Sequence, residues 1–479
     1  MISKQIPDAG GLPWVGQMPQ MTQDPLQFLL GLARTHGPIA RFTMFGKSFV
    51  LISDSEYVRE VLVTKANLFP KSSRDLAIMG PLLGYGLLTT NGAQHKKLRK
   101  LAQPAFHAKR ITTYADAMTD LALSLTDEWR DGETRDINVE MLQLTMYIVS
   151  KTLFDTDRSA MSGMADQIGH AIHQLQEVAD FDFTWYDLVP QWLPLRVNRQ
   201  RQPARHMLDQ IIEGMIAERR PDGSNAHVED RGDLLSMLML AEDENGERLT
   251  DDEVRDEAIN LFVAGHETTS NALTWTWYLL SQHPHVADKL RAELDTVLAG
   301  RTPTLHDLAN LPYTQQVIKE SMRLYPPAWV LNGRQAAADC TIGDYEIKQG
   351  QVIFIAPYVM HRLAQHFPNP EEFQPERFTP AMEEALPRYA YMPFGGGPRV
   401  CIGNSFAMME AQLLLATIAQ RFELQLDPAA RVATQPMITL TTKYGLPMQI
   451  RARQHATDTA DKQRAVPQPS VDEAELVLA

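Results

Sequence analysis

A glycine-rich stretch, residues 394–403, constrains the fold of this chain most strongly: it reads Phe-Gly-Gly-Gly-Pro-Arg-Val-Cys-Ile-Gly. Consecutive glycines followed by a proline cannot continue a helix or a strand, so the backbone turns tightly and can approach a flat ligand closely. Residues 402–416 then show a helical pattern, which places Cys401 at a helix N-terminus, where the dipole and free N–H groups lower the pKa of a thiol. Arg399 adds a positive charge nearby. The stretch predicts a loop that presents a thiolate.

Two other interpretations compete with this one: a buried core cysteine behind a glycine turn, and a phosphate-binding loop. A phosphate loop needs a closing Lys-Ser/Thr or a third spaced glycine, which the stretch lacks. The pattern Phe-x-x-Gly-x-Arg-x-Cys-x-Gly resembles the haem-binding loop of the cytochrome P450 family, in which the cysteine thiolate is the axial ligand of the haem iron. The resemblance implies haem b in contact with Phe394, Gly395, Arg399 and Gly403, with Cys401 bound to the iron.

A long helix is predicted from a capping box at residues 250–253 to about Gln282, roughly thirty residues or about 45 Å. Its middle reads Ala-Gly-His-Glu-Thr-Thr, residues 264–269. The small residues leave a groove, and the threonines can bond back to carbonyls one turn earlier. A tightly packed core helix would show the same pattern. In the resembled family the motif implies that Ala264 lies against the haem, that Thr268 holds O2 and water, and that Glu267 passes protons inward.

A basic helical segment, residues 92–100, stands out in an acidic chain. His95 and Arg99 lie four residues apart and share one helix face. The family resemblance assigns this pair, and Arg334 further on, to the haem propionates, because each buried carboxylate requires a cation beside it. A solvated basic face is the alternative, and it is the expected role of the segment's lysines. Docking of an acidic electron donor is a further hypothesis for them.

Two motifs predict a charge cluster that is structural rather than catalytic. Glu320 and Arg323 are three residues apart on a predicted helix and can pair, although such pairs are common on helix surfaces. Residues 373–378, Phe-Gln-Pro-Glu-Arg-Phe, match the family segment whose arginine completes a Glu-Arg-Arg cluster. The resemblance therefore implies that Arg377 joins the pair and that the cluster locks the core around the haem loop.

The resemblance also places the substrate pocket. Residues 69–89 are expected to be a loop that roofs it, and residues 180–201 an irregular connection over its entrance or an ordinary aromatic-rich loop. Core packing explains the apolar residues of these segments equally well. The side chains expected to line the pocket are apolar and come from three parts of the chain: Leu83, Leu87, Ala328, Val330, Met437 and Ile438.

Composition narrows the partners and the compartment. The 479 residues carry a net charge of −14, which argues against nucleic acid as a partner. The two cysteines, Cys340 and Cys401, exclude a disulfide framework and favour a reducing compartment. No apolar run has the length of a membrane span or the form of a signal peptide, so we expect a cytoplasmic protein without a membrane anchor. One domain is expected over residues 1–451, with a polar, disordered tail over 452–479.

The motifs follow one another in the order of the cytochrome P450 family, so the resemblance covers almost the whole chain. It implies a mainly α fold with a smaller β region, which includes a hairpin at residues 39–52 and strands within 331–358. It also implies a monooxygenase that inserts one atom of O2 into a C–H or C=C bond of an apolar small molecule. Electrons would come from NAD(P)H through a separate donor of ferredoxin or flavodoxin type with its reductase.

A fatty acid is the favoured substrate at this point, with terpenoids, carotenoids and polyketides as alternatives. Two further functions stay open. A peroxide-driven or isomerising haem-thiolate enzyme is disfavoured by the intact Glu267–Thr268 pair, which such relatives often lose. A haem-binding sensor without turnover is disfavoured by the open groove at Ala264 and Gly265 and by the apolar roof.

Overall fold

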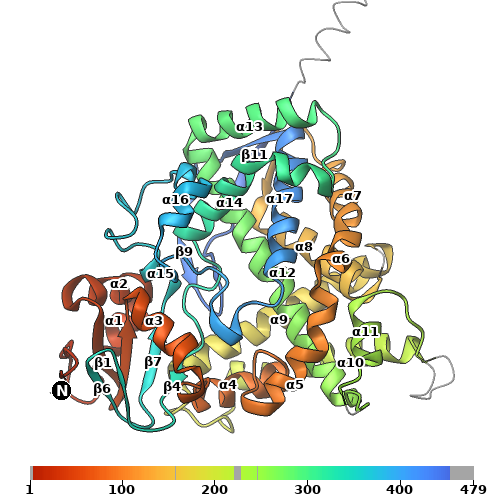
Figure 1. Cartoon of the computed structure of the whole chain (residues 1–479). Helices are drawn as coiled ribbons and strands as arrows, with labels where there is room; N and C mark the ends of the chain where they lie inside the picture. The colour runs from red at the N-terminus through yellow and green to blue at the C-terminus, as the bar shows by residue number, and fades with distance from the viewer. Residues whose placement is uncertain (1–3, 157, 221–227, 245, 454–479) are drawn as a thin grey trace, which may run out of the picture.

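The computed structural model describes residues 4–156, 158–220, 228–244 and 246–453. Helices dominate the chain, as predicted (Figure 1). Their bounds are α1 Met18–Gln23, α2 Pro25–His36, α3 Ser55–Arg59, α4 Ser73–Leu83, α5 Gly92–Ala102, α6 Ala108–Ile111, α7 Ala115–Thr126, α8 Ile137–Phe154, α9 Arg158–Trp185, α10 Arg196–Glu218, α11 Leu234–Leu240, α12 Asp251–Gln282, α13 Pro284–Leu298, α14 Pro312–Leu324, α15 Pro357–Met360, α16 Pro380–Ala385 and α17 Asn404–Arg421.

The strands form small sheets, the largest of which has the order β1-β2-β7-β4. The predicted hairpin is confirmed, since β1 and β2 pair antiparallel from Ile39↔Ile52 to Met44↔Lys47. This sheet lies with α1 to α3 at one side of the molecule (Figure 1). The bounds are β1 Ile39–Met44, β2 Lys47–Ile52, β3 Thr134–Asp136, β4 Arg334–Gln335, β5 Cys340–Ile342, β6 Tyr345–Ile347, β7 Val352–Ile355, β8 Phe422–Leu426, β9 Thr434–Pro436, β10 Leu440–Thr442 and β11 Pro447–Ala452.

Helix α12 runs through the middle of the helical region, beside α17 (Figure 1). It begins at the predicted capping box, in which Glu253 N–H donates to Thr250 and Thr250 N–H donates to Glu253. The two side-chain bonds satisfy N–H groups that a helix start leaves free. Most of its residues are buried, so both of its long sides are packed against other elements. A helix in this position can carry reactive groups into the centre of the core.

The structure corrects two of the predicted loops. Residues 69–89 contain the helix α4, capped by the Ser72 hydroxyl, which accepts from Asp75 N–H (3.4 Å). Its apolar residues 78, 79, 82 and 83 recur with helical spacing and are buried, and this burial outweighs the loop propensity of Gly80 and Pro81. Residues 180–201 are irregular only between the end of α9 and the start of α10, at 186–195.

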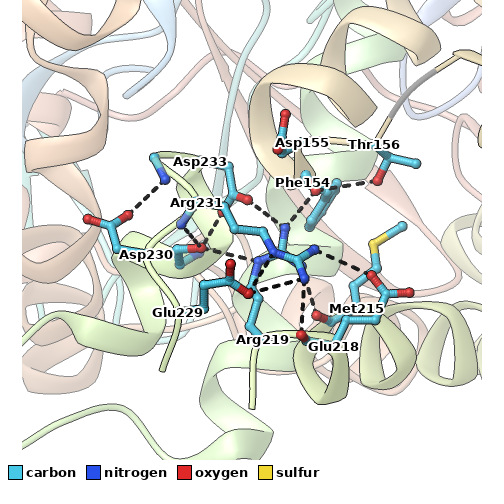
Figure 2. A network of polar contacts seen from close by, with 12 residues as sticks. Phe154, Asp155, Thr156, Met215, Glu218, Arg219, Glu229, Asp230, Arg231 and Asp233 are labelled. Atoms are coloured by element: carbon cyan, nitrogen blue, oxygen red, sulfur yellow. Dashed lines mark hydrogen bonds and ion pairs between the residues drawn. The ribbon is translucent and has the colours of Figure 1, made fainter. Parts of the chain in front are cut away.

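A buried ion-pair network ties the ends of α8, α10 and α11 together (Figure 2). Arg219 is fully buried, and its guanidinium pairs with Asp233 (2.5 Å). It also donates to the carbonyls of Phe154 (2.6 Å) and Met215 (2.7 Å). Asp233 in turn caps α11 by accepting from Ser236 N–H (2.7 Å). Because every charge has a partner, the network fixes the three helix ends relative to one another.

Among the described residues, no helix is both long and apolar enough to cross a bilayer. Strand β11 reaches Ala452, one residue into the predicted tail, and residues 454–479 lie outside the described part of the chain. The prediction of a disordered tail stays a prediction.

Candidate active site

The glycine-rich loop forms the tight turn that its sequence predicts. Gly395 (φ +70°) and Gly397 (φ +64°) have left-handed backbone conformations, which favour glycine. A Cβ atom on Gly397 would collide with the carbonyl of Leu62, so the close approach of these segments also requires glycine there. Cys401 N–H donates to the Phe394 carbonyl (2.9 Å) and closes the turn. The turn holds Cys401 in one position.

The prediction that Cys401 stands at a helix N-terminus with a lowered pKa needs correction. Helix α17 begins at Asn404, with Gly403 as its N-cap, so Cys401 precedes the helix. Burial raises the pKa of the Cys401 thiol, whereas the Gly403 N–H and the Arg99 charge act in the opposite direction. Cys401 nevertheless has exposed surface. For the free thiol, burial is therefore the largest of these effects, ahead of the turn and the nearby charge.

The middle of α12 has exposed surface as well. Ala264, Gly265 and Thr268 are partly exposed, although this part of the helix is otherwise deeply buried. The Thr268 hydroxyl donates to the Ala264 carbonyl (2.8 Å), and the Thr269 hydroxyl donates to the Gly265 carbonyl (3.3 Å). Both bonds are the back-bonds predicted from the motif. Small and hydroxyl-bearing residues thus line one accessible stretch of a core helix.

Glu267 points elsewhere, to a junction of three elements. Its carboxylate accepts from Gln176 on α9 and from the Thr439 hydroxyl, between β9 and β10. Burial raises the pKa of Glu267 to about 7, while these two hydrogen bonds oppose the rise. The carboxyl group can therefore take up and release a proton near neutral pH. His266 is buried too: its Nδ1 lies 3.0 Å from the Phe262 carbonyl, and burial lowers its pKa to about 4.

The predicted cationic residues gather around one region. Arg399 donates to the Thr90 carbonyl (2.7 Å) and to Asn91 (2.8 Å), and Arg99 donates to the Val400 carbonyl (2.8 Å). These bonds fix α5 and the segment before it against the cysteine loop. Arg399 is desolvated by burial, which lowers its pKa to about 10 with the help of the charges on Arg334 and Arg99.

Arg334 and His95 complete the cluster. Arg334 is buried, its pKa falls to about 10 because of burial, and its Nη1 has no hydrogen-bond partner among the described residues. Burial, followed by the charges of Arg399 and Lys71, lowers the pKa of His95 to about 3. Lys71 was not anticipated from the sequence: its buried Nζ donates to the carbonyls of Leu87 (3.0 Å) and Leu88 (2.6 Å). These buried cations repel one another and have few carboxylate partners. An anionic ligand would reduce that repulsion, so the cluster suits one.

The Glu-Arg-Arg cluster comes together as the sequence implied. Arg323 donates to both carboxylate oxygens of Glu320 (2.6 and 2.9 Å), and both side chains are fully buried. Arg377 lies 3.3 Å from the same carboxylate. Arg323 also donates to the carbonyls of His361 (2.9 Å) and Pro370 (2.7 Å). The cluster joins α14 to the segment that leads to the cysteine loop.

The predicted pocket residues separate into two groups. Leu83 and Ile438 line one narrow cavity, and Leu87 belongs to the same apolar core, which contains α4, α9 and α12. Ala328, Val330 and Met437 are half-buried elsewhere on the connection after α14 and before β10. There the Trp329 indole donates to the Met437 carbonyl (2.8 Å) and joins the two segments.

Polar side chains of α12 hold the segment after α4. No local sequence pattern predicted this contact. Asp256 accepts from Tyr85 N–H (2.8 Å), Glu257 from Leu87 N–H (2.9 Å) and Asn260 from Leu88 N–H (3.0 Å). These bonds link residues about 170 positions apart in the sequence. They fix the segment that carries Leu87 above α12.

Comparisons with known proteins agree with this arrangement. The sequence model of the cytochrome P450 family matches residues 7–448. The chain belongs to the cytochrome P450 family. Cyclooctatin synthase from Streptomyces melanosporofaciens is 36% identical over 90% of this P450 and 92% of the relative. Cyclooctat-9-en-7-ol 5-monooxygenase of the same organism is 36% identical, over 88% and 89%. Pentalenene oxygenase from Streptomyces avermitilis is 31% identical, over 93% and 96%.

Membership establishes the enzyme class and the cofactor. The chain is a haem-thiolate monooxygenase that uses O2 and reducing equivalents from NAD(P)H, delivered by a redox partner. The residues described above fit haem b. The turn presents the sulfur of Cys401, and the unpartnered, buried guanidinium nitrogen of Arg334 lies within a group of cations suited to the two haem carboxylates. The partly exposed residues of α12, Ala264, Gly265 and Thr268, would line the rest of the haem site.

Proposed function

We propose that this P450 oxygenates a compact, polycyclic terpenoid rather than a fatty acid. The names of the similar proteins carry the proposal: cyclooctat-9-en-7-ol and pentalenene are named as substrates of two of them, each aligned over at least 88% of this chain. The fatty-acid preference from the sequence has no support in these names.

Two cations beside the segment 69–89 already have a carboxylate partner, and the cavity wall is apolar. A fatty acid needs a cation that is free to bind its carboxylate at the pocket opening. Arg74 on α4 and Lys47 at the start of β2 are two of the cations near the connection between α9 and α10, and Asp187 of that connection pairs with both (2.8 and 2.6 Å). The narrow cavity at Leu83 and Ile438 has an almost entirely apolar wall. An uncharged, rigid hydrocarbon skeleton suits these surroundings better.

Haem, when bound, supplies the chemistry that activates O2 and transfers one oxygen atom to the substrate. Cys401 is the proposed iron ligand, held by the turn at Phe394, Gly395 and Gly403. The proposed carboxylate anchors are His95, Arg99, Arg334 and Arg399. Burial and the neighbouring cations lower the pKa of His95 to about 3 in the protein alone, and a neutral imidazole can still donate one hydrogen bond to a carboxylate.

Proton delivery is assigned to α12. The Thr268 hydroxyl lies on the accessible stretch of the helix, where its oxygen can accept a hydrogen bond from a water or a protonated ligand while its own proton is donated to the Ala264 carbonyl. Glu267, with a pKa of about 7, can exchange a proton with its surroundings at neutral pH. The pair thus supplies an acid and an adjacent hydroxyl for a reaction that consumes protons.

The redox partner is proposed to be an acidic protein of ferredoxin or flavodoxin type. A surface hollow of about 310 Å³ is lined by basic residues of α5 and the segment after it: His95, Lys96, Arg99, Lys100 and His107. Two lysines of this helix already have partners, since Lys97 pairs with Glu253 (3.2 Å) and Lys100 with Glu244 (2.9 Å). Lys96 is the lysine of the hollow best placed for an acidic partner.

An optical titration tests the substrate class. The ferric protein is titrated with the tricyclic alcohol cedrol and, separately, with palmitic acid, while the spin state of the haem is followed. Saturable conversion to high spin with cedrol and none with palmitate is the expected result. The reverse order of affinity would refute the terpenoid assignment. Turnover with a ferredoxin, its reductase and NADPH, compared with hydrogen peroxide alone, separates the monooxygenase from a peroxide-driven enzyme.

A further inference from the structure

Gln176 of α9 is a polar side chain in an apolar wall. It is 9% exposed, and it lines the narrow cavity at the heart of the apolar core. The other side chains in that wall are all apolar and come from α4, α9, α12 and the turn before β10: Met79, Leu82, Leu83, Ile172, Leu175, Val263 and Ile438. A buried carboxamide among such neighbours needs partners for both of its polar atoms.

The amide nitrogen has a partner, and the carbonyl oxygen does not. Gln176 Nε2 donates to Glu267 Oε2. The amide must be oriented this way while Glu267 is ionised, because a carboxylate can only accept hydrogen bonds. Gln176 Oε1 then faces away from Glu267, and it accepts no hydrogen bond from the described residues. A hydrogen-bond acceptor is thereby left over within reach of the proposed substrate pocket.

A second acceptor lies one helical turn further along α9. Asp180 is four residues from Gln176 and so shares its helix face. Within the described chain it takes part in no hydrogen bond or ion pair, and burial raises its pKa although its side chain has exposed surface. Because Asp180 is exposed and does not line the cavity, Gln176 is the acceptor on which the inference rests.

We propose that Gln176 is a specificity-determining residue whose Oε1 accepts a hydrogen bond from a hydroxyl group of the substrate. The preferred substrate is then a polycyclic hydrocarbon that already carries a hydroxyl group. An earlier step must introduce that hydroxyl, either an oxygenation or a cyclisation that ends with the addition of water. This inference rests on the proposed terpenoid function and deepens it. It also makes Gln176 a positioning residue for Glu267, because the same amide holds the carboxylate of the proton route.

The test compares two probes of nearly the same shape, cedrol and its parent hydrocarbon cedrane. Their dissociation constants are measured from the spin-state change of the full-length, haem-loaded protein and of Gln176→Leu. The ratio of the two constants cancels differences in solubility and in general packing. The preference for the alcohol should fall about tenfold in Gln176→Leu, the worth of one buried hydrogen bond. Gln174→Leu, the same change on the outer side of α9, should leave the ratio unchanged.

A shorter side chain provides a second variant. Gln176→Asn keeps the amide but withdraws its oxygen, and it should lower the alcohol preference in the same direction. An alcohol preference that is equal in the wild type and both Gln176 variants would overturn the role of Gln176 and leave the terpenoid function standing. A wild-type protein whose spin state responds to neither probe would overturn the terpenoid function and this inference with it.

Discussion

Replacing Arg334 by leucine should stabilise the haem-free protein and weaken haem binding. Burial lowers the pKa of Arg334 from 12.5 to about 10, an effect that Asp75 opposes. The folded state therefore disfavours the charged form of Arg334. Because the side chain is charged at pH 7 in both the folded and the unfolded protein, its burial lowers the free energy of unfolding at neutral pH. The decrease in pKa corresponds to about 3 kcal/mol.

The carboxylates of haem would offset this loss, since an ionised partner removes the reason for it. Arg334→Leu should therefore raise the stability of the apoprotein by up to about 3 kcal/mol and speed the loss of haem roughly a hundredfold. A residue with a purely structural role would not give opposite signs in the two measurements.

Urea unfolding of the haem-free protein gives the first quantity, and transfer of haem to excess apomyoglobin gives the second. Arg451→Leu is the control, because Arg451 is exposed on β11. If Arg334→Leu destabilised the apoprotein and kept its haem as long as the wild type, Arg334 would be a structural partner of Asp75 and the proposed carboxylate site would be wrong.

Four further predictions follow from the buried and charged groups. Thr268→Ala should lower product per NADPH at least roughly tenfold and release peroxide instead, and full coupling would remove Thr268 from the proton route. Burial raises the pKa of Glu410 from 4.5 to about 8, so the stability that this residue contributes should fall as the pH rises from 4.5 to 8. Glu410→Gln should therefore stabilise the protein by roughly 4 kcal/mol more at pH 8 than at pH 4.5. Equal effects of the variant on urea unfolding at the two pH values would contradict this. Arg219→Ala should cost about 3–5 kcal/mol in the same unfolding assay. Arg248→Ala, whose ion pair with Glu242 is exposed, should cost less than about 1 kcal/mol, and similar losses would mean that the buried network adds nothing. Lys96→Glu should slow reduction by an acidic ferredoxin most strongly at low salt, and a rate independent of ionic strength would rule out the docking hollow.

The sequence predicted those parts of the site that short patterns determine. The capping box at 250–253 and the back-bond of Thr268 involve residues within one turn of helix, so spacing alone indicates their geometry. The turn at Gly395 and Gly397 follows from backbone conformations that favour glycine. Family resemblance added the long-range partner Arg377, which no local pattern connects with Glu320.

What could not be predicted depends on packing between distant segments. The partners of Glu267 come from α9 and from Thr439, and no signal in either stretch marks them. The pKa of the Cys401 thiol was predicted from a local turn, but burial by distant segments also acts on the free thiol, and in the opposite direction. Helix α4 was missed because Gly80 and Pro81 favour a loop, while the burial of its apolar face favours a helix.

Iron X-ray absorption of the haem-loaded protein addresses the proposed ligand most directly. The chain contains another cysteine, Cys340, and 22 methionines, so a sulfur at the iron would not by itself identify Cys401. The spectrum of the wild type should show one sulfur ligand, and that of Cys401→Ser should show none. A sulfur ligand that persists in Cys401→Ser, or one that is missing from the wild type, would contradict the assignment of Cys401 as the thiolate that the glycine-rich turn presents.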